Sequence, residues 1–480
     1  MLFKFFILIM FIFNIASFSQ TVLFDNTHDQ NVGNSDWTIS GGYSDFADLL
    51  EKNGYKIIKE KTYLWDNLSK IDILVIPEPN KPFNKSEIIN ILKFVKNGGN
   101  LFLIANHGGA DRNGNSYDSV KVFNEFVYHF GITINSNHFS EIGLKILNSK
   151  INHKVKTIAA FAGSTINIID SDLSTPIIYS ENGIFGTESH YGKGKVITIG
   201  DSAIFDDGTG TDGKHLHNVF NSITYDHQQF ALNIFTYLSN KDFIFFNKEI
   251  PFNELKENSI TIDIFHGNNG ADNTEQFMTD ISELKNVYYS STPLNDKILK
   301  KTDILIIHEP NIPFTQKEIY LLKKYKDVKI IFLASSSFNA LNLDYTNELI
   351  KRISGKDLYF HKNQVLDSKM SVEGKPWTFI SEEKIYKTIV FSACSVGGSE
   401  KHSALLKSST NSYTDGEPAL KGSSSLIIRS DDLRITLIGF SLFSNYNFSK
   451  SIFYSDNYKK VLHNTENYIK YLIKKIDGDV

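Results

Sequence analysis

The chain has 480 residues, a formal net charge of −4 and a single cysteine, Cys394. A chain of this length exceeds what one hydrophobic core usually supports, so we expect two domains. The small net charge comes without the basic face that nucleic-acid-binding proteins carry, and this excludes that class from our expectations. One cysteine cannot form an internal disulfide, so packing alone must stabilise the fold.

Residues 1–19 have the pattern of a secretory signal peptide. Lys4 precedes an apolar run of about a dozen residues, which is shorter than a comfortable membrane span. The small residues Ala16, Ser17 and Ser19 follow, as at a cleavage site. We therefore expect an exported protein, periplasmic or extracellular, with no membrane span after cleavage; an uncleaved N-terminal anchor is the alternative.

The chain contains an internal repeat. Residues 71–88, IDILVIPEPNKPFNKSEI, match residues 302–319, TDILIIHEPNIPFTQKEI, at eleven of eighteen positions without a gap. KTIAAFAGST similarly matches KTIVFSACSV, and GKVITIGDSAIFD matches LRITLIGFSLFSN. Such self-similarity indicates a tandem duplication. We expect one copy at residues 20–240, a linker at 241–257 and a second copy at 258–480.

Strand and helix signals alternate within the first copy. TVLFD (21–25) predicts a strand, residues 44–53 carry apolar side chains at helical spacing, and YKIIKE resumes as a strand. DILVIPE and LFLIA are apolar on both faces, and Asn84 caps a helix between them. Each copy ends with a strand and an amphipathic helix, at 229–238 and 464–475. The alternation predicts an α/β fold in which helices cover both faces of a mostly parallel sheet.

Four segments of the first copy resemble a known family: VLFDNTHDQNVGNSDWTISGGYSDFADLL, DILVIPEPNKPF, FVKNGGNLFLIANHGGADRN and GKGKVITIGDS. They are similar to the class I glutamine-amidotransferase-like superfamily, in its non-amidotransferase branch of GIFT-domain and ThuA-like proteins. The resemblance implies two tandem flavodoxin-like domains. It does not imply glutamine hydrolysis, because the elbow that bears the nucleophilic cysteine in true amidotransferases reads Ile104-Ala105-Asn106-His107 here.

Polar side chains follow four predicted strands of the first copy at their carboxyl ends. These ends meet at one edge of a parallel sheet, where ligands of open α/β sheets bind, so we expect a shared crevice. A glycine-rich loop places Trp37 where it can wall this crevice, stack on a sugar or form a hydrophobic staple for the following helix. The candidate residues, in chain order, are Asp25, His28, Trp37, Glu78, Asn106, His107, Asp111, Arg112, Asp201, Ser202 and Asp206.

Imidazoles and carboxylates in one crevice suit an acid–base pair or a metal site with oxygen and nitrogen ligands. In an enzyme, His107 would be the general base and Arg112 would stabilise developing negative charge. Asp111 and Asp201 would orient the base or hold a cation. No spacing matches a metal motif, so no cofactor is evident, although the set is compatible with a divalent metal. Further imidazoles come from the segment 206–218, namely His215 and His217.

Each of these residues also has a structural interpretation. Asp25 can cap a turn, Glu78 can bond backbone amides, and Asp111 can form a local ion pair with Arg112. The second copy keeps Glu309 at the place of Glu78, and His266 lies near the place of Asp25 or His28, but Ser336 replaces His107, Phe440 replaces Asp201 and Asn445 replaces Asp206. We therefore interpret the two glutamates as structural and the second copy as degenerate.

Cys394 is a weaker candidate. It aligns with Gly163 of the first copy, and the nearby His402 allows a thiol–imidazole interpretation. A cysteine that ends a buried apolar run is more often an inert core residue.

Two functions remain open from the sequence. The first is an exported protein whose first domain binds a small polar ligand, a saccharide or cell-envelope fragment, with hydrolysis as an extension. The second is a non-catalytic assembly module of a bacterial envelope complex, as the GIFT resemblance implies. The sequence leaves the oligomeric state open.

Overall fold

A computed structural model describes residues 19–58, 68–211, 214, 216–268, 274–336, 342–399, 401–444, 447 and 455–478. The expected signal peptide up to residue 18 lies outside this part, as does His215. No helix within the described ranges is both long and apolar enough to cross a membrane. The chain divides into two compact units, with the boundary between Asn247 and Lys248.

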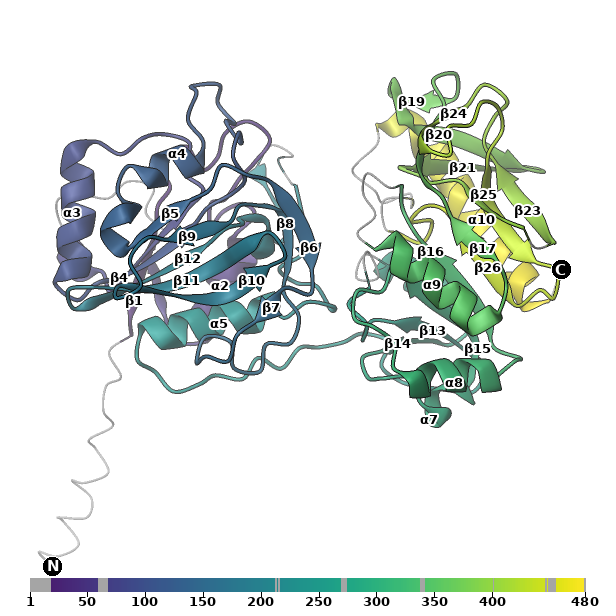
Figure 1. Ribbon diagram of the computed structural model, residues 1–480, viewed down its shortest axis with the longest axis horizontal. Coiled ribbons are helices and arrows are strands. Elements are labelled where there is room, and N and C mark those ends of the chain that lie inside the picture. Colours follow the sequence, from purple (N-terminus) through teal and green to yellow (C-terminus); the bar gives the residue numbers. More distant parts are fainter. Residues whose placement is uncertain are drawn as a thin grey trace, which may run out of the picture. The chain divides into compact units, whose positions relative to one another are not determined.

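The first unit is built on a mixed sheet with the strand order β2-β1-β3-β4-β12-β11-β10-β7 (Figure 1). Strands β2 to β12 of this order pair in parallel, and β11, β10 and β7 continue the sheet in antiparallel pairs. β5 and β9 extend it near β11, and β6 pairs separately with β8. The bounds are β1 Thr21–Phe24, β2 Lys56–Ile58, β3 Ile73–Pro77, β4 Asn100–Ile104, β5 Ile132–Ile134, β6 Phe139–Ile142, β7 Lys145–Ile146, β8 Ala159–Gly163, β9 Ile166–Ile168, β10 Ser174–Ser180, β11 Gly183–Tyr191 and β12 Gly194–Ile199.

Helices cover both faces of this sheet. Successive strand residues belong to different cores: Val22 and Phe24 of β1 enter one core and Leu23 enters the other, as the period of two in a strand requires. Residues of α2 and α5 line the first core, and residues of α3 and α4 line the second. The prediction of a parallel α/β sheet with two-sided helix cover is confirmed. The helices are α2 Ser44–Lys52, α3 Lys85–Lys96, α4 Ser119–Asn124 and α5 His227–Leu238.

The second unit repeats the strand order of the first, as β14-β13-β15-β16-β26-β25-β23. Its five leading strands are again parallel, and β25 and β23 are antiparallel. Smaller sheets pair β17 with β22, β18 with β24, and β19 with β20 and β21. The bounds are β13 Ser259–Asp263, β14 Val287–Ser290, β15 Thr302–His308, β16 Lys329–Leu333, β17 Leu358–Phe360, β18 Lys362–Leu366, β19 Ser371–Val372, β20 Lys375–Glu383, β21 Tyr386–Phe391, β22 Val396–Gly398, β23 His402–Lys407, β24 Tyr413–Glu417, β25 Ser425–Ser430 and β26 Ile435–Ile438, with helices α6 Glu275–Ser282, α7 Asp296–Leu299, α8 Gln316–Lys324, α9 Leu343–Ser354 and α10 Lys459–Asp477.

The helix after β3 begins where the sequence predicts. The side chain of Asn84 accepts hydrogen bonds from backbone amides in the first turn of α3, and the carboxylate of Glu87 accepts one from the Asn84 amide. Thr315 and Glu318 form the same capping box at the start of α8. This reciprocal pairing satisfies amides that no helical carbonyl can reach. The repeated box therefore fixes α3 and α8 equivalently against their sheets.

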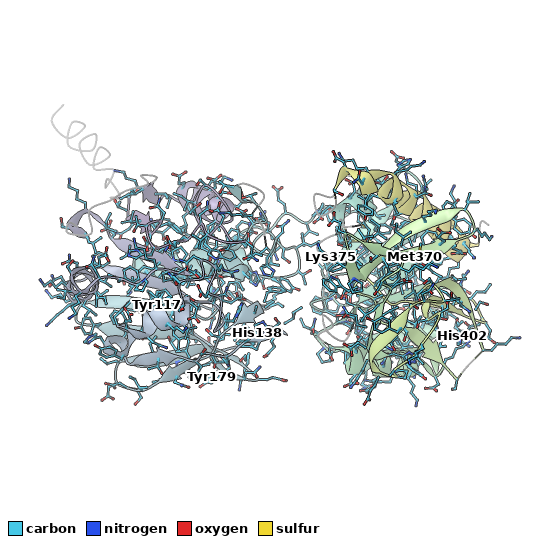
Figure 2. All side chains as sticks on the ribbon, turned by 90° about the horizontal axis from the view of Figure 1, so that it is seen from above. Tyr117, His138, Tyr179, Met370, Lys375 and His402 are labelled. Atoms are coloured by element: carbon cyan, nitrogen blue, oxygen red, sulfur yellow. The ribbon has the colours of Figure 1, made fainter. Side chains whose placement is uncertain are left out.

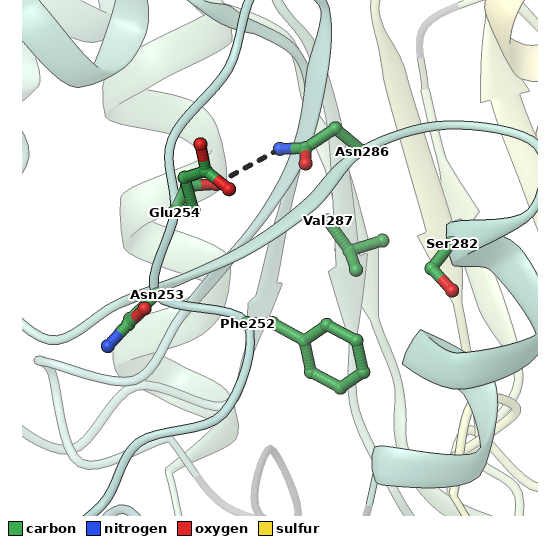
Figure 3. Close-up of a pocket in the computed structure, with 6 residues that line it drawn as sticks. All are labelled: Phe252, Asn253, Glu254, Ser282, Asn286 and Val287. Atoms are coloured by element: carbon green, nitrogen blue, oxygen red, sulfur yellow. Dashed lines mark hydrogen bonds between the residues drawn. The ribbon is translucent and has the colours of Figure 1, made fainter.

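The segment between the two sheets packs on both units in turn. Gln229 of α5 hydrogen-bonds to the main chain of Ile244 and Phe246 in the first unit. In the second unit, the amide of Tyr289 in β14 donates to the Phe252 carbonyl. A pocket of about 290 Å³ lies beside this second contact (Figure 3), lined by Phe252, Asn253, Glu254, Ser282, Asn286 and Val287. The pocket is thus formed where the connecting segment docks on the second sheet.

Candidate functional site

A buried glutamate joins three strand ends of the first unit. Glu78, directly after β3, is 0 % exposed. Its Oε1 atom accepts a hydrogen bond from Arg112 Nε at 2.5 Å. Its Oε2 atom accepts bonds from Asn106 Nδ2 at 2.8 Å, after β4, and from Ser202 Oγ at 2.5 Å, after β12. These four residues, called the Glu78 cluster below, are one group of candidates that the fold brings into direct contact.

The chain turns sharply at this glutamate. Glu78 has a φ of 27°, and Glu309 at the equivalent position has a φ of 40°. A positive φ in a residue other than glycine costs about 1–3 kcal/mol and persists only where the surroundings enforce it. Residues 104–107, where the resemblance places the elbow, contain no positive φ. The strained turn of this fold therefore lies after β3 and recurs in both units.

Arg112 reaches the cluster from the loop after β4. Nη1 donates to Asn34 Oδ1 at 2.9 Å, and the guanidinium carbon lies 5.7 Å from the centre of the Trp37 ring. The side chain is only 11 % exposed. Of the five N–H groups of a guanidinium, those on Nη2 have no hydrogen-bond partner among the described residues. The Nε and Nη1 atoms of Arg112 are thus held by Glu78 and Asn34, and the N–H groups on Nη2 remain without a partner among the described residues.

Asp111 does not pair with its neighbour. Its carboxylate accepts hydrogen bonds from the amides of Asn115 and Ser116, which closes the loop on itself. Arg112 pairs with Glu78 instead. The interpretation of Asp111 and Arg112 as a local ion pair is therefore wrong, because the guanidinium points inward while the aspartate faces its own loop.

Asp25 and His28 form a separate network. His28 Nδ1 lies 2.8 Å from Asp25 Oδ2, and His28 Nε2 lies 3.5 Å from Glu87 at the start of α3. The imidazole packs on the Phe83 ring with 3.9 Å between centroids. Burial alone would lower the pKa of His28, but the bonds and charges of the two carboxylates outweigh it and raise that pKa. The two side chains therefore connect β1 to α3.

The second unit repeats this network atom for atom. His266 Nδ1 lies 2.7 Å from Asp263, and His266 Nε2 lies 3.3 Å from Glu318, a charge contact without good hydrogen-bond alignment. Its ring stacks on Phe314 at 3.7 Å. The carboxylates outweigh burial and raise the pKa of His266 to about 9. A network kept by both units serves the fold, and the Asp-x-x-His spacing shared by the two units was the overlooked sequence signal.

Asp201 is a buried acid directly after β12. Its oxygens accept hydrogen bonds from the amides of Phe161 at 2.5 Å and Ala203 at 2.9 Å. Burial raises its pKa to about 7; the two amides oppose this, while the negative charge of Glu78 adds to it. Asp201 therefore lies beside the Glu78 cluster but is bonded to backbone, with no hydrogen bond to His107.

Asp206 holds the neighbouring loop. It accepts bonds from the amides of Gly208 and His217, and burial raises its pKa to about 7. The His217 ring lies 5.8 Å from that of Phe161. Burial lowers the pKa of His217 to about 4, and the charge of Arg112 lowers it further. The neutral imidazole of His217 and the phenyl ring of Phe161 therefore lie side by side, where the charge of Arg112 is felt. Asp206 accepts a hydrogen bond from the amide of His217, and Asp201 accepts one from the amide of Phe161.

His107 lies at the surface of this region. Its Nδ1 atom lies 2.9 Å from the Gly108 carbonyl, and its ring packs edge-on against that of His138, with 4.9 Å between the ring centroids. His138, labelled in Figure 2, is exposed. No carboxylate of the described residues hydrogen-bonds to His107. The acid–base arrangement expected around His107 therefore has no orienting carboxylate here.

Trp37 lies under the Arg112 guanidinium at the candidate site. It is 1 % exposed and packs beside Tyr43 and under Arg112. Its faces are covered, so the interpretation of Trp37 as a sugar-stacking platform is wrong. Its indole Nε1 is buried and has no hydrogen-bond partner in the described part of the chain. Leaving such a donor unpaired costs about 1–3 kcal/mol.

The described residues contain no group of three or more His, Cys, Asp or Glu side chains placed to hold a metal ion. The carboxylates of Asp201, Asp206 and Asp111 each bond to backbone amides. His215, expected to complete a metal set with His217, lies outside the described residues.

The equivalent region of the second unit has lost its charges. Glu309 accepts a bond from the amide of Ser335 at 2.5 Å. Hydroxyl pairs replace the ionic contacts, with Ser336 Oγ 2.8 Å from Ser392 Oγ and Ser335 Oγ 3.3 Å from Ser441 Oγ. The second unit therefore keeps the buried glutamate, and hydroxyl pairs lie in the surrounding region as far as the structure describes it.

Cys394 takes the place of Ser164, one residue later than the sequence alignment places it. The amide of Ser164 donates to the Gly200 carbonyl, and the amide of Cys394 donates to the Gly439 carbonyl, each at 2.8 Å. The thiol is fully buried, and burial raises its pKa well above the usual value. Such a cysteine is an inert core residue, as expected.

No family model and no curated protein matches the chain. Among solved structures, it is similar to the mmIFT52 N-terminal domain, with 17% identity over 47% of this chain and 100% of that one, at a TM-score of 0.36. It is also similar to ThuA-like proteins from Bacteroides uniformis (13% identity, 47% of this chain and 92% of that one, TM-score 0.30) and Parabacteroides merdae (11%, 48% and 94%, TM-score 0.31). Likenesses this distant say nothing about activity, and the α/β assignment comes from the strand order and the two-sided helix cover described above.

Proposed function

We propose that the first unit of this exported protein binds a small polar ligand, a saccharide or cell-envelope fragment, at the carboxyl ends of β3, β4 and β12. The observation that carries the proposal is the inward-facing ion pair of Glu78 and Arg112. Two segments far apart in sequence, residues 106–112 and Ser202, supply the partners of Glu78, and the guanidinium keeps donors without a partner among the described residues. Pockets in α/β sheets bind ligands at this edge with a few convergent polar groups.

The second unit supports this proposal by contrast. Its Glu309 keeps the same strained backbone, yet no arginine occupies the position of Arg112. The ionic arrangement is therefore an addition to the fold and not a requirement of it. Hydrolysis is the weaker extension, because His107 lacks an orienting carboxylate among the described residues.

The test is a ligand screen on the purified mature protein by thermal shift, with divalent ions and neutral, acidic and amino sugars. Glu78→Gln removes the negative charge of the cluster and leaves that of Arg112, and Glu309→Gln is its matched control in the second unit. Stabilisation that disappears in Glu78→Gln and persists in Glu309→Gln supports the proposal. A wild type that responds to none of these compounds contradicts it.

A second candidate is a non-catalytic assembly module related to GIFT domains. It is favoured by the hairpin of β20 and β21, where Trp377 is 41 % exposed, Phe391 38 % and Ile385 82 %. Exposed apolar side chains of this size are common at protein interfaces. Co-purification of envelope proteins with the wild type, lost when Ile385 and Trp377 are both changed to Ser, supports this role.

A further inference from the structure

Some of the hydrogen-bond donors of Arg112 have partners within the described structure and others do not, which is the geometry of an anion-binding group. Nε and Nη1 are fixed by Glu78 and Asn34, which sets the plane of the guanidinium. The Nη2 side has no partner among the described residues, although the side chain is 11 % exposed and thus within reach of a ligand. Planar N–H forks bind carboxylates through two parallel bonds, and a pre-set plane lowers the entropy cost of that binding.

A second, independent donor lies beside it. The Trp37 indole N–H is buried without an acceptor in the described structure, and its ring lies under the same guanidinium. Native folds rarely leave a buried donor unpaired unless water or a ligand completes it. A ligand with acceptor oxygens could complete both donors, because the indole ring lies under the guanidinium.

The charges around Arg112 decide which oxygens these are. The groups that its charge influences are Glu78, Asp201, His217 and Tyr43. Tyr43 and His217 are neutral at neutral pH, because burial raises the pKa of the first and lowers that of the second. Burial also favours the neutral form of Asp201 below pH 7. Among these groups, Glu78 forms the ion pair with Arg112, and its two oxygens already accept hydrogen bonds from Asn106, Ser202 and Arg112.

We propose that the ligand bound at these strand ends carries a carboxylate, which binds to the Nη2 side of Arg112 with the Trp37 indole N–H as an additional donor. This inference rests on the proposed ligand-binding function and specifies its chemistry: an acidic rather than a neutral small molecule. Glu78 is then a positioning residue that holds the guanidinium in place.

The test compares four probes on the mature full chain by calorimetry and thermal shift. Acetate offers a carboxylate alone, D-glucose hydroxyls alone, D-glucuronate both, and inorganic phosphate a different anion. We expect glucuronate to bind tightest, acetate weakly, and glucose not measurably. Arg112→Lys keeps the charge but loses the fork, and glucuronate should bind about tenfold more weakly. Arg352→Lys, in an exposed ion pair of the second unit, is the matched control and should change nothing.

Trp37→Phe keeps an aromatic ring and removes only the N–H, so it tests the second donor if Arg112→Lys does not fold; we expect glucuronate to bind several-fold more weakly. If glucose binds as tightly as glucuronate, the carboxylate inference is wrong and the ligand-binding function stands. If phosphate binds and no carboxylate does, the inference is likewise wrong. If no probe binds and the broader screen is also silent, both proposals fall.

Discussion

Arg112 Nε lies 2.5 Å from Glu78 Oε1, and the carboxylate in this pair is completely buried. Removing one partner of a buried ion pair leaves an uncompensated charge, which costs about 3–5 kcal/mol. We therefore expect Arg112→Met to lower the free energy of unfolding of the first unit by about 3 kcal/mol. Urea denaturation followed by tryptophan fluorescence, in a Trp377→Phe background that leaves only first-unit tryptophans, measures this change.

The double variant Glu78→Gln/Arg112→Met gives the control for that prediction. With both charges gone, no buried charge remains unpaired, and the double variant should be more stable than Arg112→Met alone. A double variant less stable than both single variants would contradict the ion-pair account.

The Asp263–His266–Glu318 network predicts a pH dependence of the second unit. The pKa of His266 rises from 6.5 to about 9 on folding, so its stabilising contribution is complete below pH 6.5 and is lost as pH rises through 9. The free energy of unfolding should fall by about 3 kcal/mol across this window. Urea denaturation at each pH, with Trp37 and Trp65 replaced by Phe so that Trp377 reports alone, measures it. In His266→Gln the slope between pH 6.5 and 9 should be absent.

Asp201 and Asp206 predict that the first unit also loses stability as pH rises, but in a lower pH range. The pKa of each rises from 3.8 to about 7 on folding, so the folded state holds their protons more tightly than the unfolded chain. Their contribution is present below pH 3.8 and is lost as pH rises through 7, at about 4 kcal/mol for each group as an upper bound. Asp201→Asn should reduce this slope by about half. A slope unchanged in that variant, measured with first-unit fluorescence, would show that Asp201 does not titrate in this range.

Cys394 predicts a difference between folded and unfolded reactivity. Its thiol is buried, and its raised pKa keeps it protonated at pH 8. Because the thiolate is the reactive form, a colorimetric disulfide reagent should label almost no thiol in the native protein and one thiol per chain in denaturant. Labelling in dilute denaturant should follow the unfolding of the second unit seen by Trp377. Fast labelling without denaturant would contradict the buried placement.

Much of the fold could be predicted from local sequence. The strands β3 and β4 are apolar on both faces, and the capping box at Asn84 predicts the start of the helix between them. The antiparallel half was not predicted. β10 and β11 form a local hairpin across Glu181 and Asn182, but their register shifts at bulges and their burial does not alternate cleanly, so the period of two that marks a strand is obscured.

The candidate site could be predicted only as a set of strand ends. The topology brings Glu78, Asn106 and Ser202 together, as the edge argument expects. The direction of each side chain could not be predicted. Asp25 turns to His28 and Asp111 to its own loop, because local backbone and neighbouring donors satisfy them first.

The turn shared by Glu78 and Glu309 has a consequence for how such proteins diversify. Since a strained backbone orients the carboxylate inward in both units, that position is committed to the scaffold. The arginine, by contrast, comes from the loop at 107–118, and the equivalent segment of the second unit, residues 335–342, contains no charged residue in its sequence. New ligand preferences can therefore evolve by changes in this loop, while the turn that bears the buried glutamate stays the same.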